Sequence, residues 1–361
     1  MPDALNRLRG AKVLVTGASG FIGRRLVAAL DHVGAEVTAL GRTRHSQKAL
    51  GGVNARFIAG DLGDAAVVAG AVAGQDVIFN LAYDFRQSAS ANVAAFEVLV
   101  GAAEREGKAR IVHASSIVVY DGWPGGALTE TSPMERPGGS PYRRAKIAME
   151  RRLMAGKCAA AILQPTIVWG PGSSLWTDGF AEALINGAVI LPEPEGLCQG
   201  VFVEDVVQAC LRAAVLMDLD RERFIINGPQ PFHWSELIKG YRGIIGHGDI
   251  RHEPASKLAP PVANGEQADG DTGPSAAARV SAVARRLIGR ERFEAIVRGI
   301  KRRMSKGGEM RPDAHLFELY VANGSCPPDA ARQRLGYVPA FGLNEGLAAT
   351  AGHLRALAGR G

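Results

Sequence analysis

The feature that most constrains the fold of this chain is an apolar segment that leads through a glycine-rich turn directly into a helix. The segment reads KVLVT, the turn GASGFIG and the helix RRLVAALDHVG. Glycines in such a turn allow the backbone to approach a pyrophosphate closely, and the helix start stabilises its charge. Because strand, glycines and helix come in this order, we predict a dinucleotide-binding turn rather than an ordinary glycine-rich turn. We expect contacts from Gly17, Ser19, Gly20, Phe21, Ile22 and Gly23.

The first half of the chain repeats this alternation of short apolar strands and helical segments. Further strands are expected within residues 35–42, 55–62, 76–82, 109–116 and 158–170. Strands that alternate with helices are typical of a parallel sheet covered by helices on both faces. We therefore predict an α/β fold, a Rossmann-type doubly wound parallel sheet over residues 10–170, to which residues 200–217 return. Residues 171–361 are expected to form mainly a smaller, irregular substrate-binding lobe.

Two segments of the second half have unusual compositions. Residues 251–278 are rich in Pro, Gly, Ala and Asp and show no periodicity, which predicts a long mobile loop. Residues 279–306 hold ten Lys or Arg against two Glu, with apolar residues at helical spacing, which predicts a basic amphipathic helix. A solvated face is the first interpretation of this helix. The alternatives are a lid over the diphosphate of a nucleotide-linked substrate and contact with an anionic membrane surface.

Charge and cysteine usage exclude several classes of protein. The net charge of +6 is concentrated in residues 279–306, so it predicts no nucleic-acid partner. The four cysteines, Cys158, Cys198, Cys210 and Cys326, are scattered without a CxxC pair, which predicts neither a metal site nor a disulfide framework. The first residues lack the basic, apolar and cleavage regions of a secretion signal. We therefore expect a cytoplasmic protein.

The segment SPYRRAKIAME, residues 140–150, contains a candidate catalytic pair. Ser140 and Pro141 favour a helix start, and on that helix Tyr142 and Lys146 lie four residues apart on one face. A nearby ammonium lowers the pKa of a phenol, which then exchanges a proton with a hydroxyl or carbonyl oxygen more readily. Two solvated side chains that share a helix face by chance are the alternative interpretation.

The glycine turn, the segment SSIVVY and the segment PYRRAK together resemble the short-chain dehydrogenase/reductase superfamily, and more narrowly its extended branch, the NAD-dependent epimerase/dehydratase-like proteins. The resemblance extends from about residue 12 to residue 209 and reappears in RLGYVPAFGLNEGL near the C-terminus. It implies that Tyr142 is the acid/base and that Lys146 binds the nicotinamide ribose and lowers the tyrosine pKa. Ser116, rather than Ser115, would hydrogen-bond the reacting oxygen, and Asn92 would have a structural and proton-relay role.

The same resemblance implies the remaining cofactor contacts and the cofactor type. The implied contacts are Asp61, Leu62, Leu81, Ala82, Pro165 and Val168. NAD enzymes usually carry an acidic residue at the end of the second strand, where this chain has Gly41 followed by Arg42. A guanidinium without a neighbouring carboxylate suits a 2′-phosphate, so NADP is favoured over NAD. The alternative is an NAD enzyme in which Arg42 stacks on the adenine.

The reaction and the substrate stay open at this stage. Ile117 and Val118 occupy the positions of the acid pair that dehydratases of this kind carry, so dehydration is disfavoured. We expect an oxidoreductase or epimerase acting on a hydroxyl or keto group of a nucleotide-activated sugar. The alternatives are an NADPH-dependent reductase of a non-sugar ketone or aldehyde and a catalytically silent NADP sensor. Candidate substrate contacts are Tyr83, Arg86, Trp123, Trp176 and Cys198. The resemblance also implies a homodimer formed by the helices after the fourth and fifth strands.

Overall fold

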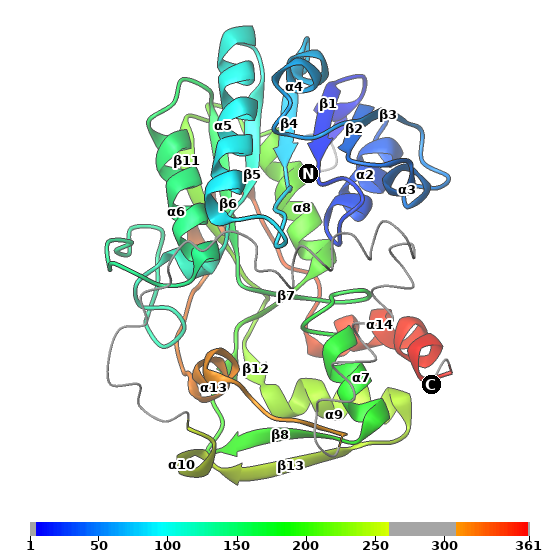
Figure 1. Cartoon of the computed structure of the whole chain (residues 1–361), viewed down its shortest axis with the longest axis vertical. Coiled ribbons are helices and arrows are strands. Elements are labelled where there is room, and N and C mark those ends of the chain that lie inside the picture. The colour runs from blue at the N-terminus through cyan, green and yellow to red at the C-terminus, as the bar shows by residue number, and fades with distance from the viewer. Residues whose placement is uncertain (1–4, 260–307, 360–361) are drawn as a thin grey trace, which may run out of the picture.

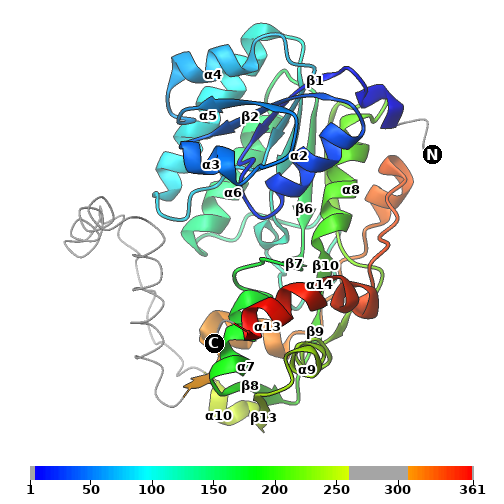
Figure 2. The same cartoon turned by 90° about the vertical axis from the view of Figure 1, so that its right-hand side faces the viewer.

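The computed structural model describes residues 5–259 and 308–359, which form two lobes (Figures 1 and 2). The larger lobe contains a seven-stranded sheet in the order β11-β6-β5-β4-β1-β2-β3, with every neighbouring pair parallel. Its strands are β1 (Lys12–Thr16), β2 (Glu36–Gly41), β3 (Ala55–Ala59), β4 (Val77–Asn80), β5 (Arg110–Ala114), β6 (Ala160–Pro165) and β11 (Arg221–Ile226). The predicted Rossmann-type fold is thus confirmed.

Helices cover both faces of this sheet because its strands are apolar on both sides. Successive side chains of a strand point to opposite faces, so Val13 and Val15 pack with α2 and α8, while Leu14 packs with α4, α5 and α6. The helices of this lobe are α2 (Gly23–His32), α3 (Arg44–Lys48), α4 (Ala65–Val72), α5 (Ala89–Glu106), α6 (Pro141–Met154) and α8 (Val203–Ala214). Figure 2 shows α2 and α8 together on one side of the sheet.

Serine caps determine where the two helices beside the site begin. The Ser88 side chain accepts a hydrogen bond from the amide of Ala91 at the start of α5, and α5 ends at the left-handed Gly107. The Ser140 side chain accepts from the amide of Arg143, with Pro141 in the first turn of α6. The predicted helix start at residues 140 and 141 is therefore confirmed.

The smaller lobe is built around a second apolar core that includes Trp169, Phe180, Trp234, Tyr241 and Tyr320. Its strands are β7 (Ile167–Trp169) with β10 (Gly200–Phe202), β9 (Leu197–Cys198) with β12 (Phe232–His233), and β8 (Ala188–Glu193) between β13 (Asp249–Pro254) and β14 (Glu309–Met310). Its helices are α7 (Asp178–Asn186), α9 (Trp234–Ile245), α10 (Ala255–Leu258), α13 (Ala314–Val321) and α14 (Leu343–Ala358). Short turns form η1 (Asn6–Leu8), η2 (Ile117–Val119) and η4 (Ala331–Leu335).

The structure corrects two boundaries in the larger lobe. The single strand expected over residues 158–170 is divided into β6 and β7, because Thr166 turns away to hydrogen-bond Ile226 and Asn227. Strand β7 then pairs with β10 outside the main sheet. Strand β11 joins the main sheet next to β6, so the larger lobe also takes in residues beyond the predicted return segment 200–217.

The predicted mobile loop over residues 251–278 is wrong at its start. Residues up to Pro254 belong to β13, which pairs with β8, and the next four residues form α10. Ion pairs join Arg251 to Glu309 and Arg311 to Glu253 and stabilise this edge. The strand therefore lacks the alternation of apolar and polar residues by which a strand is recognised in a sequence. Residues from 260 onwards in that loop, and the whole predicted basic helix 279–306, lie outside the described residues.

A buried carboxylate joins the two lobes. Asp205 on α8 is 1% exposed and accepts hydrogen bonds from the amides of Ala340, at 2.7 Å, and Phe341, at 3.1 Å. The segment that enters α14 is thereby fixed against the larger lobe. Across the described ranges, no helix combines the length and the apolarity that crossing a bilayer requires.

Candidate active site

The glycine turn packs directly against the end of β4. Gly17 has a φ of +67°, and a Cβ added to it would lie 2.9 Å from the amide nitrogen of Ala82 and from the carbonyl oxygen of Leu81. A Cβ on Gly23, the first residue of α2, would lie 2.2 Å from the carbonyl oxygen of Gly17. No side chain fits at either position, so the turn presents bare backbone at a helix start. This arrangement fits the pyrophosphate of a dinucleotide.

The end of β2 is crowded, so a side chain at Gly41 would require its neighbours to move by a few tenths of an ångström. A Cβ on Gly41 would lie 3.0 Å from a ring carbon of Phe57 and 3.0 Å from the Cβ of Ser46. The next residue, Arg42, is 44% exposed and forms an ion pair with Asp84, which follows β4. Sequence reasoning identified Arg42 but missed Asp84, because the two residues lie 42 positions apart.

The predicted adenine contact, Asp61, lies just after β3. Its Oδ1 accepts a hydrogen bond of 2.8 Å from the amide of Gly63, which fixes the turn that leads towards α4. Its neighbour Leu62 is partly buried and packs against the core beneath α4 and α5. Both residues therefore lie at the carboxyl edge of the sheet, the edge at which ligands bind in open parallel sheets.

The structure brings together Ser116, Tyr142 and Lys146. The Ser116 hydroxyl lies close enough to the phenol of Tyr142 to lower its pKa. Lys146 is 3% exposed, donates to the carbonyl oxygen of Ala114 at 2.6 Å, and has its Nζ 5.7 Å from the centroid of the Tyr142 ring. Ser115 instead donates to Glu150 in the protein interior, so of the two serines Ser116 is the one that acts on the phenol.

The predicted lowering of the tyrosine pKa is wrong. Burial raises the pKa of Tyr142 to about 12, although the hydrogen bond with Ser116 opposes this shift. Burial also lowers the pKa of Lys146 to about 8, against the opposing effect of the Glu150 carboxylate. The physical reason is that the cost of removing each group from water exceeds the opposing effect of its partner, Ser116 for the tyrosine and Glu150 for the lysine. At neutral pH the tyrosine therefore holds its proton and the lysine is still mainly charged.

Asn92 on α5 fixes the loop that joins β4 to α5. Its side-chain oxygen accepts from the amide of Asp84 at 2.8 Å, and its side-chain nitrogen donates to the carbonyls of Asp84 and Ser88 at 3.0 and 2.9 Å. These three bonds account for a structural role. The proton-relay role stays a prediction.

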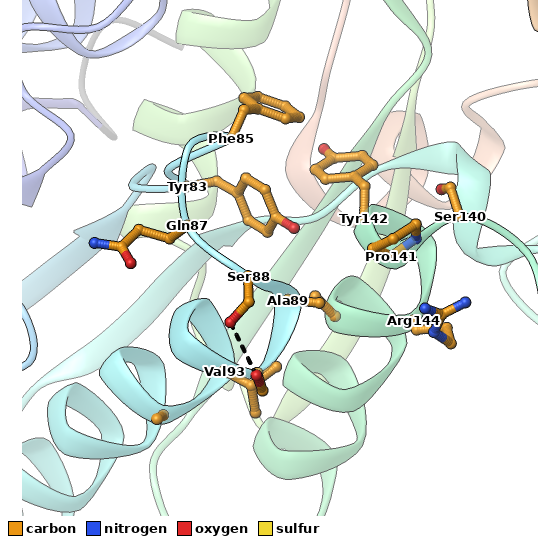
Figure 3. A pocket seen from close by; sticks show the side chains of 13 residues that line it. Tyr83, Phe85, Gln87, Ser88, Ala89, Val93, Ser140, Pro141, Tyr142 and Arg144 are labelled. Atoms are coloured by element: carbon orange, nitrogen blue, oxygen red, sulfur yellow. Dashed lines mark hydrogen bonds between the residues drawn. The ribbon is translucent and has the colours of Figure 1, made fainter. Parts of the chain in front are cut away.

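Three aromatic rings meet at the acid/base candidate (Figure 3). The centroid of the Tyr142 ring lies 4.9 Å from that of Tyr83, edge to face, and 5.3 Å from that of Phe85. Phe85 is 77% exposed although it is fully apolar. The rings border a cavity of about 1010 Å³ between the starts of α5 and α6. Its lining is Tyr83, Phe85, Gln87, Ser88, Ala89, Ser90, Val93, Ala94, Ser140, Pro141, Tyr142, Arg144 and Ala145.

The chain matches a known protein family over most of the larger lobe. The model of the NAD dependent epimerase/dehydratase family matches residues 13–227, a range that includes the glycine turn and the cluster of Ser116, Tyr142 and Lys146. The chain belongs to the NAD-dependent epimerase/dehydratase family. It is an enzyme, and the relatives to which it is similar include proteins named as reductase, dehydrogenase, dehydratase and epimerase.

Individual relatives of this epimerase/dehydratase chain differ in the substrates that their names give. It is 25% identical to a 2-alkyl-3-oxoalkanoate reductase of Stenotrophomonas maltophilia, over 93% of this chain and 97% of that one. It is 28% identical to a 3β-hydroxysteroid dehydrogenase/isomerase of Mycobacterium tuberculosis, over 66% and 70% of the two chains. The solved structure of MoeE5 in complex with UDP-glucose and NAD shares the fold, with a TM-score of 0.66 and 23% identity over 96% and 99% of the two chains.

The other predicted substrate contacts of this family member lie apart from the aromatic cavity. Cys198 is fully buried in the core of the smaller lobe, and Trp176 packs 5.6 Å from Trp234 in the same lobe. Trp123 is partly buried and packs on the edges of two apolar cores. Arg86 binds Asp84 through its guanidinium, at 2.8 Å. Tyr83 alone among the five predicted contacts lines the cavity.

The last two predicted cofactor contacts lie where the main sheet ends and the smaller lobe begins. Pro165 is buried at the end of β6, and Val168 is partly buried in β7, where its carbonyl accepts from the Ser173 hydroxyl at 3.0 Å. Both positions follow the carboxyl edge of the sheet, beside the strand that carries Ser116. A contact with a nicotinamide ring at these positions stays a prediction.

Sequence reasoning missed a buried polar network behind this site. Glu150 on α6 is 0% exposed and accepts from Ser115, Gln164 and Arg223, the last at 2.7 Å. Because Ser115 directly precedes Ser116, this carboxylate fixes the segment between β5 and η2 in which Ser116 lies. The signal in the sequence is Glu150 itself, which is four residues beyond Lys146 and therefore faces the sheet.

Proposed function

We propose that this enzyme reduces a ketone to a secondary alcohol, with Tyr142 as the acid that protonates the carbonyl oxygen. The observation that carries this proposal is that Ser116 and Tyr142 come together beside the buried Lys146, whose Nζ lies 5.7 Å from the centroid of the Tyr142 ring. Both hydroxyls can donate to one substrate oxygen, which orients the carbonyl and polarises it. A bound nicotinamide cofactor supplies the hydride in this chemistry.

The protonation states of the site favour reduction. With its pKa raised to about 12, Tyr142 carries its proton at neutral pH and is ready to give it to a carbonyl oxygen. The carbon–oxygen π bond breaks as the carbon gains a hydride and the oxygen gains this proton. Lys146, held by the Ala114 carbonyl, keeps a positive charge near the phenolate that remains. Oxidation of the alcohol is the same sequence in reverse.

We further propose that the cofactor is NADP. Support comes from the end of β2, where Gly41 stands in the place of the acid that selects NAD and Arg42 supplies a cation for a 2′-phosphate. Gly17, Gly23, Ala82 and Asp61 would hold the rest of the dinucleotide.

For the substrate, we propose an apolar ketone that is not a sugar. Tyr83 and the exposed Phe85 place apolar surface next to the reacting hydroxyl of Tyr142, and an apolar substrate would remove that surface from water. The relatives named as 2-alkyl-3-oxoalkanoate reductase and 3β-hydroxysteroid dehydrogenase support the same class. A nucleotide-activated sugar is the second candidate, supported by the complex of MoeE5 with UDP-glucose and NAD.

The test replaces the phenol and keeps the ring. The Tyr142→Phe variant should lose at least about a hundred-fold in the rate of ketone reduction. Its dissociation constant for NADPH should not change, since the hydroxyl is lost and the ring stays. Oxidation of NADPH is followed with 3-oxo acyl compounds, oxosteroids and UDP-4-ketosugars as substrates.

Tyr320→Phe is the matched control, because the buried Tyr320 hydroxyl lies in the smaller lobe and has no hydrogen-bond partner among the described residues. This control should retain full activity. Turnover that survives in Tyr142→Phe would refute the assigned mechanism, and turnover of the UDP-4-ketosugar alone would refute the apolar substrate.

A further inference from the structure

Asp84, which the sequence did not single out, lies between two guanidinium groups. Its Oδ2 is paired with Arg42, and its Oδ1 accepts from Nε of Arg86 at 2.8 Å. A second nitrogen of Arg86 lies 3.1 Å from Oδ2, so Arg86 holds the carboxylate with two bonds. The Asp84 side chain is 19% exposed, against 44% for Arg42 and 42% for Arg86. The carboxylate is thus the most protected member of this charged group.

The pair of Arg42 and Asp84 crosses the mouth of the cofactor groove. In the sheet, β1 lies between β4 and β2, and Arg42 follows β2 while Asp84 lies in the loop after β4. Two strand spacings amount to about 10 Å, a span that an arginine and an aspartate side chain can bridge together. The strand that they bridge is β1, whose end carries Gly17. The ion pair therefore lies where a dinucleotide would lie on the turn.

We propose that the Asp84 carboxylate occupies the position at Arg42 that the 2′-phosphate of NADP takes when it binds. This competition would set the discrimination between NADP and NAD, and it rests on the NADP preference proposed above. Arginine presents the same fork of N–H groups to a carboxylate and to a phosphate, so the two anions compete for it. NAD has no anion at this position and leaves the pair intact.

Two neighbours allow the carboxylate to leave Arg42 at low cost. Arg86 keeps two bonds to Asp84 after Arg42 is released, so the carboxylate stays paired. Asn92 holds both the amide and the carbonyl of Asp84, so the backbone keeps its place while the side chain turns. The competition is therefore confined to one side chain and does not require the loop with Phe85 to move.

The experiment measures binding without turnover. Asp84→Asn removes the competing charge and should tighten NADP binding about two- to five-fold, the range expected for an exposed ion pair, with NAD binding unchanged. Asp84→Glu keeps the charge and should leave both dissociation constants near those of the wild type. Glu36→Gln removes an equal charge at the opposite end of β2, where Glu36 is exposed, and should change neither. Isothermal titration with each oxidised dinucleotide gives all of these values.

A double-mutant cycle separates competition from general electrostatics. In an Arg42→Ala background, which should weaken NADP binding, adding Asp84→Asn should no longer tighten it. Tightening that persists in this background, or equal tightening for NAD, would overturn the inference. Because binding alone is measured, a negative result here leaves the Tyr142 mechanism standing if Tyr142→Phe is inactive. A wild-type chain that binds neither dinucleotide would overturn both proposals.

Discussion

Lys146 is the residue whose charge state most directly limits the chemistry. It is buried beside Tyr142, and burial lowers its pKa from 10.5 to about 8. Its charge supports the phenolate that proton transfer leaves on Tyr142. The lysine is therefore effective while protonated, and its ionisation falls within an accessible pH range.

The rate of ketone reduction should consequently fall as pH rises through about 8, while the free energy of unfolding should change in the opposite direction. Between pH 8 and 10.5 the unfolded chain binds more protons at this lysine than the folded chain does, so stability rises with pH over that interval. Profiles of kcat/KM and urea unfolding at the same pH values test both effects. In Lys146→Met this rise of the free energy of unfolding with pH should disappear. A rise that is unchanged in the variant would show that another group causes it.

At the scale of elements, Arg143 joins the helix with the acid/base to the segment after the serine. From α6, its guanidinium donates to the carbonyls of Val118 and Val119, each at 3.1 Å, and pairs with Asp121. It also donates to the carbonyl of Arg136 at 3.0 Å. One side chain thus fixes the turn η2, which follows Ser116, against the start of α6.

Arg143→Ala should therefore lower stability by about 1–3 kcal/mol, since buried carbonyls lose their donors. It should also reduce kcat more than it changes KM, because Ser116 loses its fixed position relative to Tyr142. Arg151, farther along α6, is exposed and does not line the cavity, so Arg151→Ala is the matched control. Urea unfolding and steady-state kinetics on both variants give the comparison. Equal losses in the two variants would contradict this role for Arg143.

Local spacing made part of the site predictable. Tyr142 and Lys146 share a helix face, and Ser116 follows a strand, so short stretches of sequence place all three. Phe85 and Asp84 could not be predicted in the same way, because each gains its role from a partner on a distant segment. For Asp84 that partner is 42 positions away, and only the strand order brings the two together. The predicted direction of the Tyr142 pKa shift was wrong for a related reason, because the burial that raises this pKa depends on the whole packed site.

At the scale of the whole molecule, continuous apolar strands and crossover helices sufficed to predict the larger lobe. The smaller lobe was less predictable, because β13 is stabilised by charges across an exposed edge and β7 leaves the main sheet at Thr166. The homodimer through α5 and α6 stays a prediction. Asp205 contributes to the contact between the lobes, since it accepts hydrogen bonds from two backbone amides.

Asp205→Ala should leave both amides without an acceptor and cost about 2–4 kcal/mol of unfolding free energy. Protease cleavage near residue 340 should also become faster, because the segment before α14 loses its attachment. Asp329→Ala, at an exposed acid paired with Arg332, is the control and should stay within about 0.5 kcal/mol of the wild type. Chemical unfolding and limited proteolysis measure the two effects. An unaltered cleavage rate in Asp205→Ala would show that other contacts hold the segment.

The buried Glu150 has a consequence for how a substrate can enter. If α6 slid or rotated against the sheet, this carboxylate would lose its hydrogen bonds from Arg223, Gln164 and Ser115. An uncompensated charge would then remain in the interior. We therefore expect the wall of the site that carries Tyr142 to move little. Admission of a bulky molecule must come from the opposite wall, where the exposed ring of Phe85 can swing into solvent without breaking a single polar contact of its own side chain.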